Sequence, residues 1–66
     1  MKRRDLDKKI TEIAKNHNAV VEITHGGSHD HCKINGLPIT TLPRHREINE
    51  MTARGILNKL RKHLEE

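Results

Sequence analysis

The chain contains no phenylalanine, tyrosine or tryptophan, and only one cysteine among its 66 residues. Without aromatic rings it cannot stack nucleic-acid bases as many single-strand-binding modules do. With Cys32 alone it can form no internal disulfide, which fits a reducing compartment. The hydrophobic core must therefore be assembled from aliphatic side chains and this one cysteine.

Long apolar segments are missing as well. No run is long enough for the hydrophobic part of a signal peptide or for a membrane span. We therefore expect a cytoplasmic protein without a membrane partner. The length suits one small domain over residues 1–66, and a chain of this size buries only about 60% of its unfolded surface, so its stability is marginal.

Positive charge exceeds negative charge. Thirteen lysines and arginines stand against nine aspartates and glutamates, which gives a net charge of +4 and a pI of about 9.6. A basic balance favours a polyanion such as nucleic acid, or an acidic partner protein. An ordinary soluble surface with a modest charge bias is equally compatible with it.

Apolar residues recur at helical spacing near both ends of the chain. The first pattern predicts a helix over roughly residues 4–17 and consists of Leu6, Ile10, Ile13 and Ala14. The second predicts a helix from about Glu50, with Asn49 or Thr52 as its N-cap, and consists of Ala53, Ile56, Leu57, Leu60 and Leu64.

Three short extended segments lie between the helices, over residues 19–24, 28–34 and 37–42. Asn35-Gly36 between the last two is a strong hairpin signal, because a type I′ turn needs positive φ at both central residues. Pro38 cannot donate to a ladder, so the third strand should be an edge. The sequence predicts a two-layer α+β domain, α-β-β-β-α, with both helices on the apolar face of an antiparallel sheet.

A two-residue turn fixes a register that strand parity can check. It pairs Ile34 with Leu37, and Cys32 with Ile39, and these four residues form an apolar face. Continued without interruption, it pairs His31 with Thr40, Asp30 with Thr41, and His29 with Leu42. His29, His31 and Lys33 then share the open face, while Asp30 and Cys32 point toward the core.

The segment HGGSHDH, residues 25–31, holds three histidines. His25, His29 and His31 with an open position would suit Zn²⁺, but Cys32 points inward and carboxylates to orient the rings are scarce. The plainest alternative is that they are ordinary surface residues, as we expect for His17 and His63 near the helix ends. The favoured interpretation has no metal and no cofactor.

Acid–base chemistry on RNA is the favoured interpretation of these histidines, after a metal site and ordinary surface residues. Histidine offers both protonation states near neutral pH. Gly26 and Gly27 leave room for a phosphate, Ser28 can donate a hydrogen bond, and Lys33, Arg44 and Arg46 can neutralise phosphate charge. An imidazole there can take the proton from a ribose 2′-OH, which attacks the adjacent phosphorus. DNA lacks that hydroxyl and is not an expected substrate.

A longer pattern strengthens this interpretation. Gly27-Ser28-His29 is followed by a hairpin, by Pro43-Arg44-His45 with Glu47-Ile48, and by Thr52 at the start of a helix that carries Ile56-Leu57. In this order of motifs, from the first helix to Leu60, the chain resembles the HicA family of mRNA-interferase toxins.

The resemblance implies a fold similar to double-stranded-RNA-binding domains and metal-independent cleavage of mRNA. It implies His29 as the catalytic residue and a HicB-type antitoxin that covers it. Pro43 and His45 match the second family motif, which makes His45 a candidate supporting residue. Ser28 and His31, from the loop and the open face, are further candidate supporting residues. Gly26, Gly27, Lys33, Arg44 and Arg46 are candidate RNA contacts.

Two other functions stay open. A non-catalytic double-stranded-RNA-binding domain would have a similar fold and would use basic residues of the second helix, here Arg54, Lys59, Arg61 and Lys62. A small interaction module would present its open sheet face or sheet edge to another protein, which is compatible with a toxin held by its antitoxin.

Overall fold

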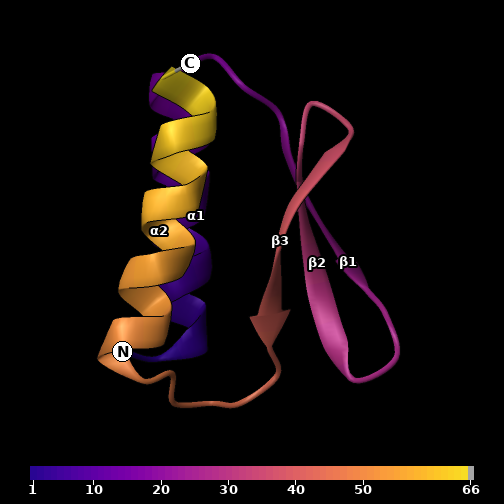
Figure 1. Cartoon of the computed structure of the whole chain (residues 1–66), viewed down its shortest axis with the longest axis vertical. Helices are drawn as coiled ribbons and strands as arrows, with labels where there is room; N and C mark the ends of the chain where they lie inside the picture. The colour runs from indigo at the N-terminus through magenta and orange to yellow at the C-terminus, as the bar shows by residue number, and fades with distance from the viewer. Residues whose placement is uncertain (66) are drawn as a thin grey trace.

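The computed structural model describes residues 1–65, which form a helix, a three-stranded antiparallel sheet and a second helix (Figure 1). The elements are α1 (Arg3–Asn16), β1 (Val21–His25), β2 (His29–Ile34), β3 (Leu37–Pro43) and α2 (Glu50–Glu65). The strands lie in the order β1-β2-β3, so β3 is an edge strand, as its proline predicts. The predicted α-β-β-β-α order is confirmed.

Both helices begin and end close to where the sequence places them. At the end of α1, Asn18 adopts φ 55°, and the N–H of Ala19 donates to the carbonyl of Ala14 at 2.8 Å. At the start of α2, Asn49 Oδ1 accepts the N–H of Met51 at 2.8 Å, so Asn49 is the N-cap.

The two helices pack against each other and cover one face of the sheet, which leaves the other face open (Figure 1). α1 contacts β1, and α2 contacts β3. The buried core is aliphatic apart from Cys32, and its residues with no exposed surface are Leu6, Ile10, Leu42 and Leu60. No helix among the described residues has both the length and the apolarity that a membrane crossing requires.

The hairpin between β2 and β3 turns at Asn35 and Gly36, which have φ values of 52° and 82° as the type I′ turn requires. Ile34 pairs with Leu37 as predicted, and Lys33 pairs with Pro38 as the same register requires. The register then shifts, so that Cys32 pairs with Thr40 and Ile39 is the extra residue of a β-bulge.

Because of the bulge, the predicted pairing is wrong for the rest of β3. Asp30 pairs with Leu42 and His29 with Pro43, one residue later than the uninterrupted register. Because a one-residue slip reverses which face a side chain occupies, Leu42 moves from the open face into the core. Leu37, expected in the core, lies at the start of the edge strand and stays 55% exposed.

The first residues of the chain run beside the loop that leads into α2. The N–H of Arg3 donates to the carbonyl of Arg46 at 2.9 Å, and the N–H of Ile48 donates to the carbonyl of Met1 at 2.7 Å. These bonds place the start of α1 next to residues 44–48, although the two segments are about forty residues apart.

Candidate active site

His29 stands at the first position of β2, opposite Pro43, with its side chain exposed. Ser28 Oγ lies 3.1 Å from His29 Nδ1, within hydrogen-bond distance. In the tautomer that carries its proton on Nδ1, the ring donates to Ser28 and presents the Nε2 lone pair, the form that a general base needs. Ser28 therefore acts on the orientation of His29.

A groove of about 370 Å³ runs beside His29, between β3 and α2. We call it the His29 groove; Thr41 and Pro43 line it from β3, and Thr52, Gly55 and Lys59 line it from α2. The hydroxyls and the ammonium group suit a phosphate. The sequence assigns Thr52 and Lys59 to the second helix, but only the packing of α2 along the edge strand brings them to His29.

His31 does not line the His29 groove. Its half-buried ring lies over Gly26, where a Cβ atom would come within 2.6 Å of His31 Nε2. The space left by Gly26 is therefore taken by an imidazole of the same chain. Gly27 is open, with nothing within 4 Å of the position of its absent Cβ.

Asp30 is the centre of a polar cluster that the sequence did not reveal. Its side chain is 5% exposed, and its Oδ1 accepts from Arg44 Nε at 2.7 Å and lies 2.8 Å from His25 Nδ1. Its Oδ2 lies 2.9 Å from the guanidinium of Arg3. We call these four residues the Asp30 cluster. A buried carboxylate requires such partners, and the inward parity of Asp30 was the only signal in the sequence.

The hydrogen bond from His25, followed by those from Arg44 and Arg3, holds the pKa of Asp30 well below its usual range. Asp30 is therefore ionised at neutral pH and fixes three cationic or titratable side chains. One of them reaches further, because Arg44 also donates to the carbonyl of Gly27 at 3.0 Å and to that of Gly26. Arg44 thus ties the glycine loop that precedes His29 to β2.

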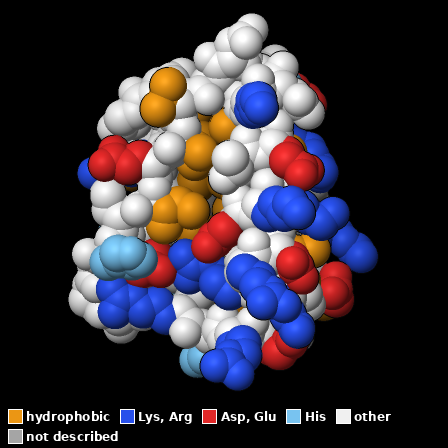
Figure 2. Space-filling model, turned by 180° about the vertical axis from the view of Figure 1, so that it is seen from behind, with side chains coloured by type: hydrophobic (Ala, Val, Ile, Leu, Met, Phe, Trp, Pro, Cys, Tyr) orange, Lys and Arg blue, Asp and Glu red, His pale blue; other side chains and the backbone are white. Residues whose placement is uncertain are grey.

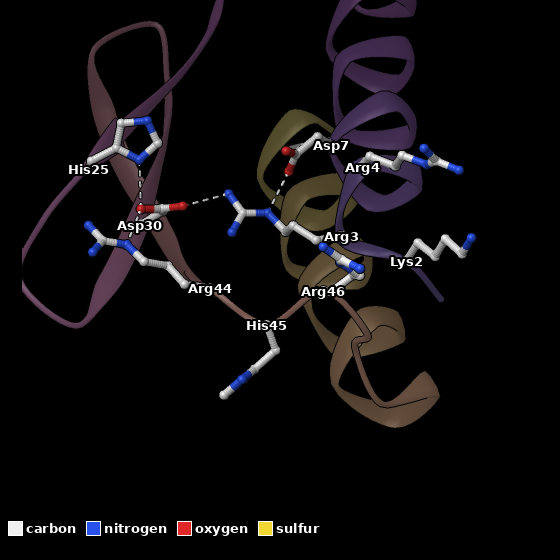
Figure 3. A pocket seen from close by; sticks show the side chains of 9 residues that line it. All are labelled: Lys2, Arg3, Arg4, Asp7, His25, Asp30, Arg44, His45 and Arg46. Atoms are coloured by element: carbon white, nitrogen blue, oxygen red, sulfur yellow. Dashed lines mark hydrogen bonds and ion pairs between the residues drawn. The ribbon is translucent and has the colours of Figure 1, made fainter.

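The remaining candidates lie away from the His29 groove. His45 and Arg46 line a larger hollow together with the Asp30 cluster (Figure 3). Lys33 lies near the far end of β2, four residues beyond His29 or about 13 Å along the strand. Lys33 lines neither space.

The described residues contain no group of three or more histidine, cysteine, aspartate or glutamate side chains placed to share a metal ion. Cys32 lies in the core, where burial raises the pKa of its thiol. His25 is tied to Asp30, His29 faces the groove and His31 covers Gly26, so the three histidines of the segment do not converge.

Comparisons with protein-family models, with curated proteins and with solved structures gave no match to this chain. The fold and the side-chain geometry therefore carry the functional argument, together with the motif order.

Proposed function

We propose that the chain is a metal-independent endoribonuclease of the mRNA-interferase type, in which His29 transfers protons, and that a HicB-type antitoxin inhibits it. The observation that carries the proposal is an exposed imidazole whose Nδ1 lies 3.1 Å from Ser28 Oγ, beside a groove of hydroxyl and ammonium groups. The Gly27-Ser28-His29 motif selects the same histidine.

In the proposed reaction His29 Nε2 takes the proton of a ribose 2′-OH. The 2′ oxygen forms a bond to the adjacent phosphorus, and the bond between phosphorus and the 5′ oxygen of the next nucleotide breaks. That 5′ oxygen leaves with a proton from the imidazolium or from water. The products are a 2′,3′-cyclic phosphate and a 5′-hydroxyl end, and DNA is inert because it has no 2′-OH.

Lys59 and Thr52 give the groove a role in the same reaction. An ammonium group beside the scissile phosphate opposes the negative charge that develops on its oxygens, and a hydroxyl can donate to one of them. Lys59 also belongs to the basic surface of α2, so the same residue serves RNA binding in either function that the sequence left open.

Met51 supports the second half of the proposal. It lines the His29 groove and is 80% exposed, the largest exposure among the large hydrophobic side chains of the described residues. Methionine is common at protein interfaces because its flexible thioether adapts to a partner. An antitoxin that buries Met51 would cover His29 at the same time.

An RNA-cleavage assay with EDTA present throughout tests the proposal. The wild type is compared with His29→Ala and with His17→Ala, a matched control at an exposed histidine beyond the end of α1. We expect His17→Ala to keep full activity and His29→Ala to lose about 10²–10⁴-fold, the usual contribution of a positioned acid or base. A folded His29→Ala variant that cleaves normally contradicts the assignment.

Two other outcomes of these assays would favour a different function. If EDTA abolishes cleavage by the wild type, the reaction depends on metal. If duplex RNA shifts in a gel without any strand scission, the chain is a non-catalytic double-stranded-RNA-binding domain, and alanine substitution of Lys59 should weaken that shift while His29→Ala should not.

A further inference from the structure

A second hollow, with a volume of about 700 Å³, shares no lining residue with the His29 groove (Figure 3). We call it the basic hollow. Its walls are the start of α1, the end of β1 and the loop after β3. All nine lining residues are titratable: five lysines and arginines, two histidines and two aspartates.

The two aspartates are already engaged within the protein. Asp30 uses both oxygens in the Asp30 cluster, and Asp7 Oδ1 accepts from Arg3 Nε at 2.8 Å. Arg3 also donates to the carbonyl of Pro43 at 2.8 Å, so Arg3 and Arg44 are fixed as internal braces. The carboxylates therefore do not oppose an incoming anion as free charges.

The other cations remain available. Within residues 1–65, Lys2, Arg4 and Arg46 make no ion pair, and all three are exposed. Five cations against two carboxylates leave three positive charges on the lining. From behind, Lys and Arg side chains gather across the lower half of the molecule (Figure 2).

His25 adds an exposed imidazole at the edge of the hollow. Its Nδ1 lies 2.8 Å from Asp30 Oδ1 and its side chain is 76% exposed. A ring that donates Nδ1–H to Asp30 can also donate to a phosphate from Nε2 in the imidazolium form, which carries a proton on both nitrogens. Asp30 thus orients one imidazole toward solvent and fixes two arginines behind it.

We propose that the basic hollow binds backbone phosphates of the RNA strand that is cut at His29, with Lys2, Arg4 and Arg46 as the phosphate contacts. His29 and Asp30 are neighbours on β2 whose side chains point to opposite faces, and Pro43 and Arg44 are neighbours at the end of β3. In each of these pairs one residue lines the His29 groove and its neighbour lines the basic hollow, so one RNA strand that passes along them would contact both.

The lining favours RNA over an acidic protein. Protein interfaces have apolar or aromatic centres with few charges, whereas nucleic-acid interfaces are polar and strongly positive. The basic hollow has no apolar residue in its lining. This site rests on the proposed function for the position of the cut, but its affinity for RNA can be measured without cleavage.

The test measures binding of a fluorescent single-stranded RNA to full-length protein carrying His29→Ala, across 50–200 mM salt. The variant Arg4→Gln/Arg46→Gln removes two charges from the hollow. The control Lys8→Gln/Lys15→Gln removes two exposed charges elsewhere on α1, and neither of those lysines lines the hollow. Circular dichroism confirms that both variants are folded.

Two lost phosphate contacts should lower the slope of log K against log salt by about 1.4, since each contact contributes about 0.7 for a single strand. Over this salt range the parent should lose about sevenfold more affinity than the hollow variant, while the control keeps the parent slope. Equal losses in both variants, or no loss in the hollow variant, overturn the proposal. So does a hollow variant that binds RNA normally but no longer binds an acidic partner protein.

The two proposals fail separately. If His29→Ala abolishes cleavage but the hollow variant binds RNA as the parent does, the basic hollow is wrong and the active site stands. If the hollow variant loses binding while His29→Ala still cleaves, the RNA site stands and the catalytic assignment is wrong.

Discussion

Replacing Leu42 by alanine tests the β-bulge that turns this side chain inward. Leu42 has no exposed surface, and the substitution removes three buried carbons. At about 0.8 kcal/mol each, their transfer is worth ~2.4 kcal/mol, and the cavity left behind raises the expected loss to about 3 kcal/mol. A domain of this length has a total stability of roughly 3–10 kcal/mol, so the variant should lose about a third of that stability or more.

Leu37→Ala is the matched control, because it makes the same change in the same strand at a residue that is 55% exposed. We expect it to cost about 0.5 kcal/mol or less. Urea unfolding followed by far-ultraviolet circular dichroism measures both variants, since the chain has no aromatic residue to report by fluorescence. With a slope of about 1 kcal/mol per molar urea, Leu42→Ala should lower the midpoint by up to about 3 M. Equal losses in the two variants would refute the bulged register.

Two further predictions concern the Asp30 cluster and the glycine loop. The pKa of Asp30 is lowered in the folded state by His25, Arg44 and Arg3, so below about pH 4 the unfolded chain binds the proton first and stability falls as pH falls. Urea midpoints of the wild type should therefore drop more steeply between pH 5 and pH 2 than those of Asp30→Asn, and parallel curves would contradict the depressed pKa. Gly26→Ala places a Cβ 2.6 Å from His31 Nε2 and should cost about 1–2 kcal/mol. In a His31→Ala background this cost should shrink by at least about 0.5 kcal/mol; an unchanged cost would mean that the ring does not occupy this space.

The hairpin shows where local sequence rules hold and where they stop. Asn35-Gly36 specifies its turn because few residues adopt positive φ, and the turn then dictates the first two pairs of the ladder. The bulge at Ile39 has no equally local signal. A proline that cannot donate at the neighbouring position is compatible with a bulge, but also with an unbroken edge strand.

The candidate site divides in the same way. The exposure of His29 and the burial of Asp30 both follow from alternation along β2, and the structure bears out both. Alternation along one strand does not predict which residues of the helices pack beside it. Lys59 reaches the His29 groove from α2, and Arg3 reaches Asp30 from α1, because packing joins segments that the chain keeps far apart.

His31 and Arg44 show the same limit in residues that the sequence did single out. Both were expected to serve a bound RNA, yet His31 covers Gly26, and Arg44 is committed to Asp30 and to two glycine carbonyls. A charged side chain has many possible partners within its reach, and only the folded arrangement decides which one it meets. Arg46 and Lys2, by contrast, make no ion pair among the described residues.

The sequence by itself determined the order of elements, the aliphatic core, the edge position of β3 and the outward face of His29, because each depends on periodicity or on one residue's backbone preference. Tertiary structure alone decided the bulge that buries Leu42, the Asp30 cluster, the His29 groove and the basic hollow. Those features depend on contacts between side chains that are far apart in the sequence, and short-range sequence patterns do not specify such contacts.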